Sequence, residues 1–248
     1  MYEKVERILP NIATIATFEE HEARYQFAGS FAEGKRVLDL ACGAGIGTSY
    51  LLRAGARSCT GVDISREAVE FAAGHYPGPR FVVGDGLRVP LDDESVDVVV
   101  SFETIEHVKD PAKFVAECYR VLVPGGLFVG STPNDPVTRW VDPGNNPFHL
   151  HRFNVQKMAE LLSTKFRDVH LFAQSPVLYP ATVAKQLSVR VLNLLRLTDP
   201  VLRMVGKGRL VAICNRSEYS FPAEPSSIVP YSPSWIQQPT VTVATATK

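Results

Sequence analysis

One short segment limits the fold of this chain more than any other: an apolar stretch that runs directly into a glycine-rich turn. It reads VLDLACGAGIGT over residues 37–48, and a helical pattern follows it. Glycines allow a ligand to approach the bare backbone, and in open α/β sheets such a turn stands at the carboxyl end of the first strand. The segment therefore predicts an α/β protein with a ligand site at that edge.

The chain around this turn alternates short apolar runs with amphipathic stretches, which is the pattern of repeated βαβ units. Helices are predicted after the N-caps Ser65, Asp110 and Asn154, with Gly74 ending the first of them. The predicted strands are Arg36–Leu40, Ser58–Val62, Arg80–Val83, Val96–Phe102, Gly126–Ser131, Val169–Ala173 and Leu210–Asn215.

Three regions are expected along the chain. Residues 1–34 form an N-terminal helical cover, and residues 35–216 form the main domain, with a helical insertion at about 176–208. Residues 217–248 are rich in Pro, Ser and Thr, so we expect a disordered tail without a core of its own. Thr182–Leu197 predicts a cover helix with a solvated basic edge. The alternatives are contact with a membrane surface through 182–209 and contact with an anionic substrate.

Composition excludes several classes of protein. Lys+Arg 26 balance Asp+Glu 26, so there is no strong signal for nucleic-acid binding. The four cysteines contain no C-x-x-C pair, which argues against a zinc knuckle or a disulfide scaffold. The chain holds no apolar run of about 18 residues, and charged residues occupy the place of a signal peptide. We expect a cytoplasmic protein.

Acidic residues accompany the glycine turn. The order is G-x-G-x-G rather than the dinucleotide order G-x-G-x-x-G, and Asp39 precedes it, where it disfavours a pyrophosphate and tolerates a cationic ligand. Asp63 ends the next predicted strand and can accept both hydroxyls of a ribose. Asp85 ends the third and can accept from an adenine amino group. Any one of them alone is typical of a strand-end turn; together they predict a nucleoside site.

These motifs resemble class I S-adenosylmethionine-dependent methyltransferases. The resemblance rests on VLDLACGAGIGT, GVDIS, GDGLRVPLDDESVDVVVS and VLVPGGLFVGSTPN, which together cover about residues 35–134. It implies a Rossmann-like, doubly wound, seven-stranded, mostly parallel sheet with an antiparallel last strand in a three-layer α/β/α arrangement. It also implies S-adenosyl-L-methionine as the cofactor.

The resemblance assigns the cofactor-binding residues. Ala41 departs from the family by replacing the first glycine of the loop, and Gly86 replaces a larger residue, which we expect to loosen the adenine pocket. In the segment HEARY, Arg24 and Tyr25 can reach the cofactor carboxylate, although Tyr25 can equally serve packing. The full set is Tyr25, Asp39, Ala41, Gly43, Gly45, Asp63, Ile64, Asp85, Gly86 and Ser101.

A second cluster follows the fourth predicted strand. On a helical turn, Glu103, Glu106 and His107 would project to one side, and two more imidazoles follow in NPFHLH. Crowded carboxylates and imidazoles need a cation, a proton-transfer role or a solvent-facing turn to account for them.

The segment SFETIEHVKDP resembles ubiquinone-biosynthesis O-methyltransferases, and E-x-x-E-H also matches small-RNA terminal 2′-O-methyltransferases. NPFH recurs in bacterial methyltransferases of sugars or glycans. These resemblances imply Mg²⁺ or Mn²⁺ on Glu103, Glu106, His107 and His149. Without a metal, the catalytic residues are His107 or His149 as base, with His151 in reserve, and Glu103 in the acceptor pocket.

The sequence thus predicts O-methylation of a hydroxyl on a small molecule, sugar or glycan, because an alcohol must lose its proton to attack the methyl group. One alternative is a metal-free C- or N-methyltransferase of a small metabolite. Others are a non-catalytic cofactor-binding protein and, against the G-x-G-x-G order, a nicotinamide-dependent oxidoreductase.

Overall fold

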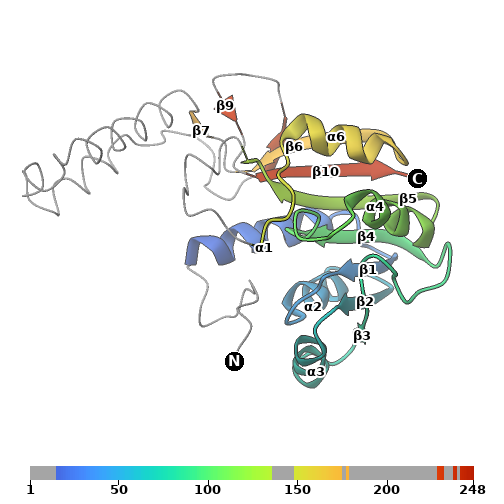
Figure 1. Ribbon diagram of the computed structural model, residues 1–248. Coiled ribbons are helices and arrows are strands. Elements are labelled where there is room, and N and C mark those ends of the chain that lie inside the picture. Colours follow the sequence, from blue (N-terminus) through green and yellow to red (C-terminus); the bar gives the residue numbers. More distant parts are fainter. Residues whose placement is uncertain (1–14, 136–147, 175–176, 179–227, 232–236, 239–240) are drawn as a thin grey trace, which may run out of the picture.

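The computed structural model of the protein describes residues 15–135, 148–174, 177–178, 228–231, 237–238 and 241–248. Its main sheet has the strand order β3-β2-β1-β4-β5-β10-β6-β8 (Figure 1). The strands are β1 Arg36–Leu40, β2 Ser58–Asp63, β3 Arg80–Val83, β4 Val96–Phe102, β5 Leu122–Pro133, β6 Arg167–Gln174, β8 Ile228–Pro230 and β10 Val241–Thr247. The two-residue strands β7 (Val177–Leu178) and β9 (Gln237–Gln238) pair with each other.

The order of the parallel strands reverses between β1 and β4. Strands β1, β2 and β3 run outward in one direction, and β4 and β5 continue from β1 in the other, all of them parallel. In open α/β sheets, ligands bind outside the carboxyl ends of the strands at such a reversal. The glycine turn leaves β1 at this point, so the fold places it where a ligand site is expected.

The antiparallel last strand comes from a segment that we expected to be disordered. β10 lies between β5 and β6 and is antiparallel to both, and Val241–Ala246 are buried. The expectation of an unstructured tail is therefore wrong for Val241–Thr247. Its alternating Val, Thr and Ala are small or β-branched and suit a central strand, but they resemble a Ser/Thr-rich tail in composition. The seven-stranded sheet is confirmed, with β8 added at one edge.

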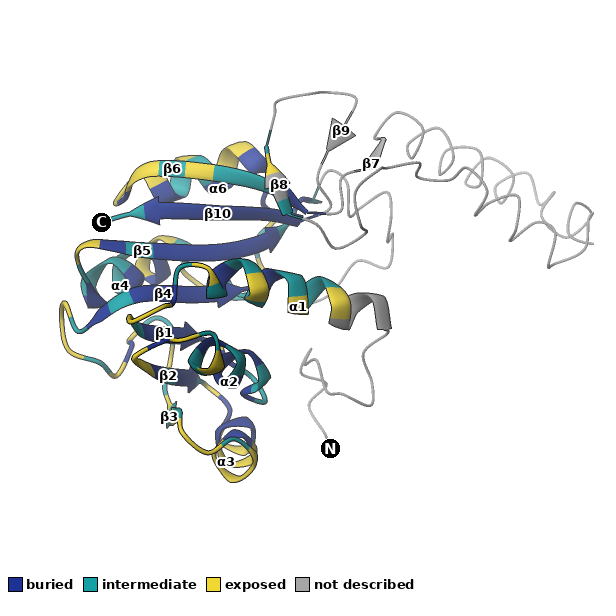
Figure 2. Ribbon diagram, turned by 180° about the vertical axis from the view of Figure 1, so that it is seen from behind, coloured by how far each residue is buried: buried dark blue, intermediate teal, exposed yellow. Residues whose placement is uncertain are grey.

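Helices cover both faces of the sheet (Figure 2). On one face, α1 (Ile15–Gly29) and α2 (Ile46–Arg53) pack over a core that includes Val98, Val100 and Val129. On the other face, α4 (Pro111–Val121) and α6 (Val155–Ser163) supply Phe114, Cys118, Met158 and Leu162 to a larger core. α3 (Arg66–His75) packs against β2 and β3. The result is the expected three-layer arrangement.

The predicted helix starts are confirmed. Ser65, Asp110 and Asn154 each accept a hydrogen bond from the backbone N–H three residues later, as N-caps do. The predicted stop at Gly74 is wrong, because α3 continues through it to His75. α4 ends at Val121 and passes directly into β5 at Leu122.

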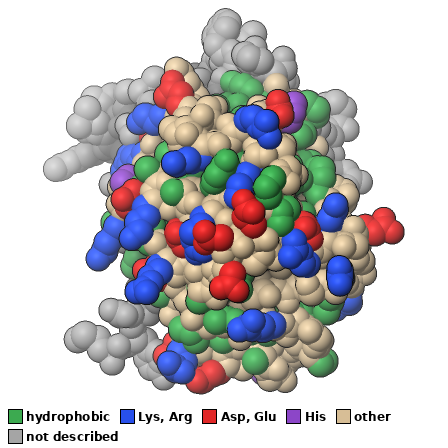
Figure 3. All heavy atoms as spheres, turned by 90° about the vertical axis from the view of Figure 1, so that its right-hand side faces the viewer, with side chains coloured by type: hydrophobic (Ala, Val, Ile, Leu, Met, Phe, Trp, Pro, Cys, Tyr) green, Lys and Arg blue, Asp and Glu red, His purple; other side chains and the backbone are tan. Residues whose placement is uncertain are grey.

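Other expectations fall on residues outside the described part of the chain. They are the helix at 182–197, with its alternative of membrane contact at 182–209, and the strand at 210–215. Among the described residues, no helix combines the length and apolar character needed to span a bilayer. On the face shown in Figure 3, Lys and Arg side chains are interspersed with Asp and Glu rather than gathered in one patch.

Candidate functional site

The glycine turn after β1 is built from left-handed backbone conformations. Gly43 and Gly45 have φ angles of 53° and 82°, and Ala41 has a φ of 64°. A Cβ on Gly43 would meet nothing within 4 Å, so this part of the turn faces open space. At Gly45 it would lie 2.6 Å from the Cβ of Ala72, so that glycine allows α3 to approach. The turn therefore presents bare backbone to a ligand, as the sequence predicts.

Asp39 lies buried beneath this turn, with 1% of its surface exposed. Its Oδ2 accepts a hydrogen bond of 2.6 Å from Thr48 Oγ1, and its Oδ1 lies 3.2 Å from the donor hydroxyl of Tyr25. Burial raises the pKa of Asp39 to about 7, although both hydrogen bonds oppose that shift. A cation beside this carboxylate would favour its ionised form.

Tyr25 reaches the glycine turn from α1. Its ring packs against Gly47, where any Cβ would overlap it, and makes an edge contact of 5.1 Å between centroids with Phe102. Tyr25 therefore combines packing with a hydrogen bond to Asp39. Arg24, the preceding residue, does not join it, because its Nη1 donates to Gln174 Oε1 at the end of β6.

Asp63 ends β2 with its carboxylate held in place by backbone. Oδ2 accepts from Gly43 N at 2.8 Å and Oδ1 accepts from Ser65 N at 2.9 Å. Each carboxylate oxygen has a second lone pair, so both can still accept hydroxyl donors. The neighbouring Ile64 is 74% exposed, which is unusual for an isoleucine and leaves its side chain open to contact with a ligand.

Asp85 follows β3 and is exposed. Its Oδ1 accepts from Leu87 N at 2.8 Å, which fixes the turn. A Cβ at Gly86 would lie 2.9 Å from the ring of Phe114. The aromatic ring already occupies the space that a larger residue at position 86 would use.

Ser101 lies in β4 at the same edge of the sheet. Its hydroxyl donates to the carbonyl oxygen of Leu40 at 2.8 Å. Ser101 therefore ties β4 to β1 at the reversal of strand order, beneath the site. This contact positions the strand ends, and the hydroxyl can still accept one hydrogen bond from a ligand.

The acidic and imidazole cluster after β4 divides into two parts. Glu103 has a φ of 49° and its Oε1 accepts from Ser131 Oγ at 2.7 Å. The left-handed backbone turns Glu103 away from the segment that follows, so the three residues do not share a helical face as expected. Among the described residues, the group able to hold a cation is Glu106, His107 and His149, whose ligand atoms lie within 4.8 Å of one another.

This three-residue group, which we call the Glu-His-His cluster, is held by hydrogen bonds. Glu106 is 2% exposed and its Oε2 accepts from Thr132 Oγ1 at 3.0 Å. His107 Nδ1 lies 3.0 Å from the carbonyl oxygen of Phe148. A carbonyl only accepts, so Nδ1 carries the hydrogen, and Nε2 has the lone pair of the neutral ring. That nitrogen lies 3.8 Å from Glu106 Oε1.

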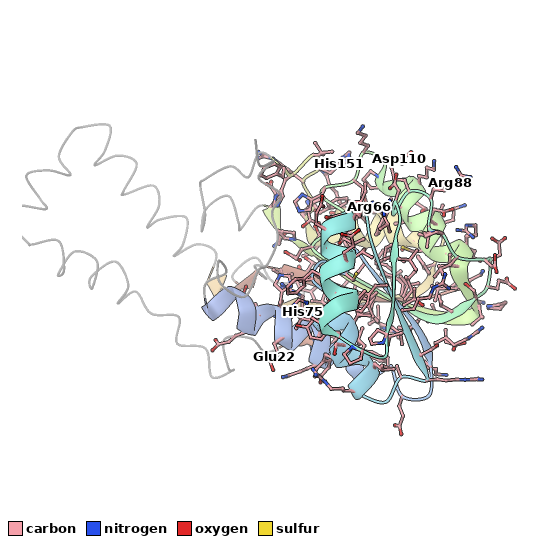
Figure 4. The ribbon with its side chains drawn as sticks, turned by 90° about the horizontal axis from the view of Figure 1, so that it is seen from below. Glu22, Arg66, His75, Arg88, Asp110 and His151 are labelled. Atoms are coloured by element: carbon pink, nitrogen blue, oxygen red, sulfur yellow. The ribbon has the colours of Figure 1, made fainter. Side chains whose placement is uncertain are left out.

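His151 lies beside this cluster but outside it. Its backbone N–H donates to the carbonyl of Glu106 at 3.0 Å, and its ring contacts the segment before α4, near Asp110 (Figure 4). The structure therefore brings residues 148–151 beside Glu106 and His107, just after the end of β4. His149 rather than His151 belongs to the Glu-His-His cluster.

Three hydroxyl residues of the site were not predicted. Thr48 donates to Asp39, while Ser131 and Thr132 of β5 donate to the two glutamates. Thr48 could have been predicted, because it is a polar residue in the first turn of the helix that follows the glycine segment. Ser131 and Thr132 carry no motif, because only the pairing of β4 with β5 brings them near Glu103 and Glu106.

Comparisons with known proteins agree with this geometry. Residues 38–130 match a family model described as a methyltransferase domain. A relative from Mycolicibacterium smegmatis, named a probable S-adenosylmethionine-dependent methyltransferase, is 41% identical over 164 residues, covering 64% of this chain and 62% of that protein. The chain thus matches less than two thirds of that relative's length.

Two further proteins illustrate the range of similarity. A phthiotriol/phenolphthiotriol dimycocerosates methyltransferase from Mycobacterium ulcerans is 39% identical over 112 residues, which is 43% of this chain and 41% of that protein. A crystal structure of a Thermotoga maritima S-adenosylmethionine-dependent methyltransferase has a TM-score of 0.63 at 15% identity, covering 94% of this chain and 91% of that one. The latter likeness supports the fold.

Proposed function

This chain belongs to the class I S-adenosylmethionine-dependent methyltransferases, and we propose that it transfers the methyl group of S-adenosyl-L-methionine to a hydroxyl oxygen. The observation that carries the donor assignment is the placement of two carboxylates around a bare backbone turn. Asp39 lies under the turn, and Asp63 is oriented by the N–H of Gly43 within it. This pattern suits a ligand with an ammonium group at one end and a ribose at the other.

Each part of the chain has a defined task toward the donor. When bound, the donor supplies a methyl group on a sulfonium sulfur. Asp39 would attract the ammonium from beneath the turn, the second lone pairs of Asp63 would accept the ribose hydroxyls, and Ile64 would contact the adenine. Asp85 would accept from the adenine amino group, and Tyr25 covers the turn from α1. Placing the methyl group in line with an acceptor oxygen provides a large part of the rate enhancement.

A hydroxyl acceptor is supported by the Glu-His-His cluster beyond the end of β4. An alcohol must lose its proton as it attacks, and a neutral imidazole with a lone pair on Nε2 can accept it. His107 has that tautomer because Phe148 O fixes its Nδ1–H. His149, 4.9 Å away between ring centroids, is the second base candidate. Glu103, held by Ser131, shapes the acceptor pocket.

One relative is compatible with a hydroxyl acceptor. The Mycobacterium ulcerans protein is named a phthiotriol/phenolphthiotriol dimycocerosates methyltransferase, and a triol is a compound with hydroxyl groups. For this chain we propose a hydroxyl on a small molecule, sugar or glycan. Phe148 and Leu150 flank His149 and are 43% and 56% exposed, so apolar parts of an acceptor have side chains to contact there.

A divalent cation is proposed to assist this step. The Glu-His-His cluster offers one carboxylate and two imidazoles, a donor set that suits first-row metal ions such as Mn²⁺. When bound, such an ion lowers the pKa of an acceptor hydroxyl. Glu106 Oε1 and His107 Nε2 face each other and would hold it, together with His149.

The metal proposal has a test that does not require turnover. Titration of Mn²⁺ into the full chain, followed by electron paramagnetic resonance, should show one site whose affinity falls at least about tenfold in Glu106→Gln. Glu160→Gln, an exposed carboxylate on α6, should bind Mn²⁺ as the unsubstituted chain does. Equal binding by both variants would exclude this cluster as the metal site.

Acceptor chemistry is tested with matched pairs of compounds. Each pair has one carbon skeleton that carries either a hydroxyl or an amine, and conversion of S-adenosylmethionine to S-adenosylhomocysteine is followed. Conversion with hydroxyl compounds and little with their amine counterparts supports O-methylation. The reverse preference would favour the N-methyltransferase alternative. If the chain binds S-adenosylmethionine but forms no S-adenosylhomocysteine with any fraction of a cell extract as acceptor, the result would favour a non-catalytic protein.

A further inference from the structure

Arg24 is the largest fully buried side chain among the described residues. Its guanidinium is charged and forms no ion pair with another described residue. Arg24 is 2% exposed, and its Nη1 donates to the neutral amide oxygen of Gln174 at 2.6 Å. Its Nε is buried and has no hydrogen-bond acceptor within the described part of the chain. An arginine is always protonated, and burying an unpaired charge is costly, so the residue needs an explanation.

The neighbouring groups do not neutralise this charge. Gln174 donates its Nε2 to the carbonyl oxygen of Glu20, so it acts as a neutral link between α1 and β6. His21, one turn away on α1, stays uncharged, because burial and the charge of Arg24 lower its pKa to about 3. Among the described residues, the group that contacts the Arg24 guanidinium is therefore a neutral amide.

Arg24 contacts the end of β6, away from the strand that carries Asp39. Gln174 is the last residue of β6, and it pairs with Val241, which pairs in turn with Pro133 at the end of β5. The strand order places β4, β5 and β10 between β1 and β6. At about 4.8 Å per strand, Gln174 is roughly 19 Å from the strand that carries Asp39. Tyr25 and Arg24 therefore point from one helix to opposite parts of the edge.

We infer that Arg24 binds an anionic group of the acceptor, a carboxylate or a phosphate, through its guanidinium at the ends of β5 and β6. This inference rests on the proposed methyl transfer for the identity of the ligand as an acceptor. Guanidinium groups bind carboxylates and phosphates through parallel hydrogen bonds, and Nε is one of the nitrogens that such an arrangement uses. The anion would supply both the missing charge and the missing acceptor.

The test uses inorganic phosphate and acetate as probes on the full chain. A ligand that binds only the folded state raises the melting temperature with concentration. We expect both anions to stabilise the unsubstituted chain and the control Arg57→Gln, an exposed arginine. In Arg24→Gln the apparent Kd for the anion should rise at least tenfold. Gln174→Glu provides a second route, because an internal carboxylate beside Arg24 should likewise weaken anion binding.

Calorimetry with S-adenosylhomocysteine separates the two sources of an anion. If the acceptor supplies it, Arg24→Gln binds this product within about twofold of the unsubstituted chain. A tenfold loss would instead assign Arg24 to the cofactor carboxylate and overturn the inference. Anion-dependent stabilisation that is absent from the unsubstituted chain, or unchanged in Arg24→Gln and Gln174→Glu, would also overturn it. Failure of the proposed methyl transfer would appear separately, as absence of product binding by the unsubstituted chain.

Discussion

The hydroxyl of Tyr25 lies 3.2 Å from Asp39 Oδ1, and this contact joins the helix before the sheet to the carboxylate beneath the glycine turn. The two residues are 14 positions apart, and the ring between them covers Gly47. Asp39 is therefore closed off from solvent by an element that precedes the sheet. The site is completed by α1. The hydrogen bonds from Tyr25 and Thr48 lower the pKa of Asp39 and so oppose the larger rise that burial causes.

Ala41 is strained where the family has a glycine, so Ala41→Gly should stabilise the fold. Its φ of 64° costs an L-residue about 1 kcal/mol or more, and glycine adopts this angle freely. We expect the free energy of unfolding, measured by urea denaturation, to rise by about 0.5–1 kcal/mol after the greater flexibility of the unfolded glycine is included. Ala112→Gly, in the first turn of α4, should lower it by a similar amount. An equal decrease in the free energy of unfolding in both variants would contradict backbone strain at Ala41.

Asp39 should make stability depend on pH. Burial raises its pKa from 3.8 to about 7, so the folded state holds the proton more tightly than the unfolded state. The stabilisation from this group is therefore present below its unfolded pKa and lost as pH rises through about 7. As pH rises from 3.8 to about 7, the free energy of unfolding should therefore fall less steeply in Asp39→Asn than in the unsubstituted chain.

Asp97→Asn is the control of opposite sign for that measurement. The hydrogen bond from Arg36 lowers the pKa of Asp97, so its stabilisation is present at neutral pH and lost as pH falls through the lowered value. Its replacement should change only the acid side of the profile. An Asp39→Asn profile parallel to that of the unsubstituted chain from mildly acidic to neutral pH would show that Asp39 titrates normally.

Gly86 should tolerate no side chain. A Cβ there would lie 2.9 Å from Phe114, so Gly86→Ala should lower the free energy of unfolding by about 1–3 kcal/mol. Gly74→Ala is the matched control, because Gly74 lies in α3 with open space around it and should gain about 0.5–1 kcal/mol. Thermal denaturation of the pair measures both. A neutral Gly86→Ala would mean that the space beside Phe114 is larger than the structure shows.

Glu103 and His107 should affect methyl transfer without affecting the cofactor. Replacing either with Ala is expected to lower kcat at least about a hundredfold, because base or pocket function is removed. Affinity for S-adenosylhomocysteine should stay within about twofold, since we assign neither residue to the donor site. His75→Ala, an exposed histidine of α3, should leave both quantities unchanged. Equal losses of kcat and cofactor affinity would place these residues in the cofactor site.

Local patterns were sufficient for the parallel strands and for the turns that carry the residues assigned to the cofactor. Asp39, Gly43 and Asp63 are close in sequence to the strands that place them, so a strand followed by a turn predicts their position. The antiparallel strand at Val241–Thr247 was missed because pairing with β5 and β6, rather than its own composition, makes it a strand. Burial between two partners overrode the polar character of its threonines.

The part of the sheet edge proposed for the acceptor was predicted less completely. It depends on backbone angles and on contacts between residues that are distant in sequence. Glu103 was assigned with Glu106 from helical spacing, but its left-handed backbone directs it to Ser131. The contact between Arg24 and Gln174 joins residues 150 positions apart, and no motif indicates it. Such contacts follow from how α1 crosses the sheet, and periodicity alone does not contain that information.

Calorimetric titration of S-adenosylmethionine into the full chain and into Asp63→Ala tests the central claim most directly. The carboxylate is held by the N–H groups of Gly43 and Ser65, and loss of charged hydrogen bonds to two ribose hydroxyls should weaken binding by about 10- to 100-fold. Asp92→Ala, an exposed aspartate between β3 and β4, should bind as the unsubstituted chain does. Absence of heat with the unsubstituted chain, or equal affinity in Asp63→Ala, would contradict the donor site described above.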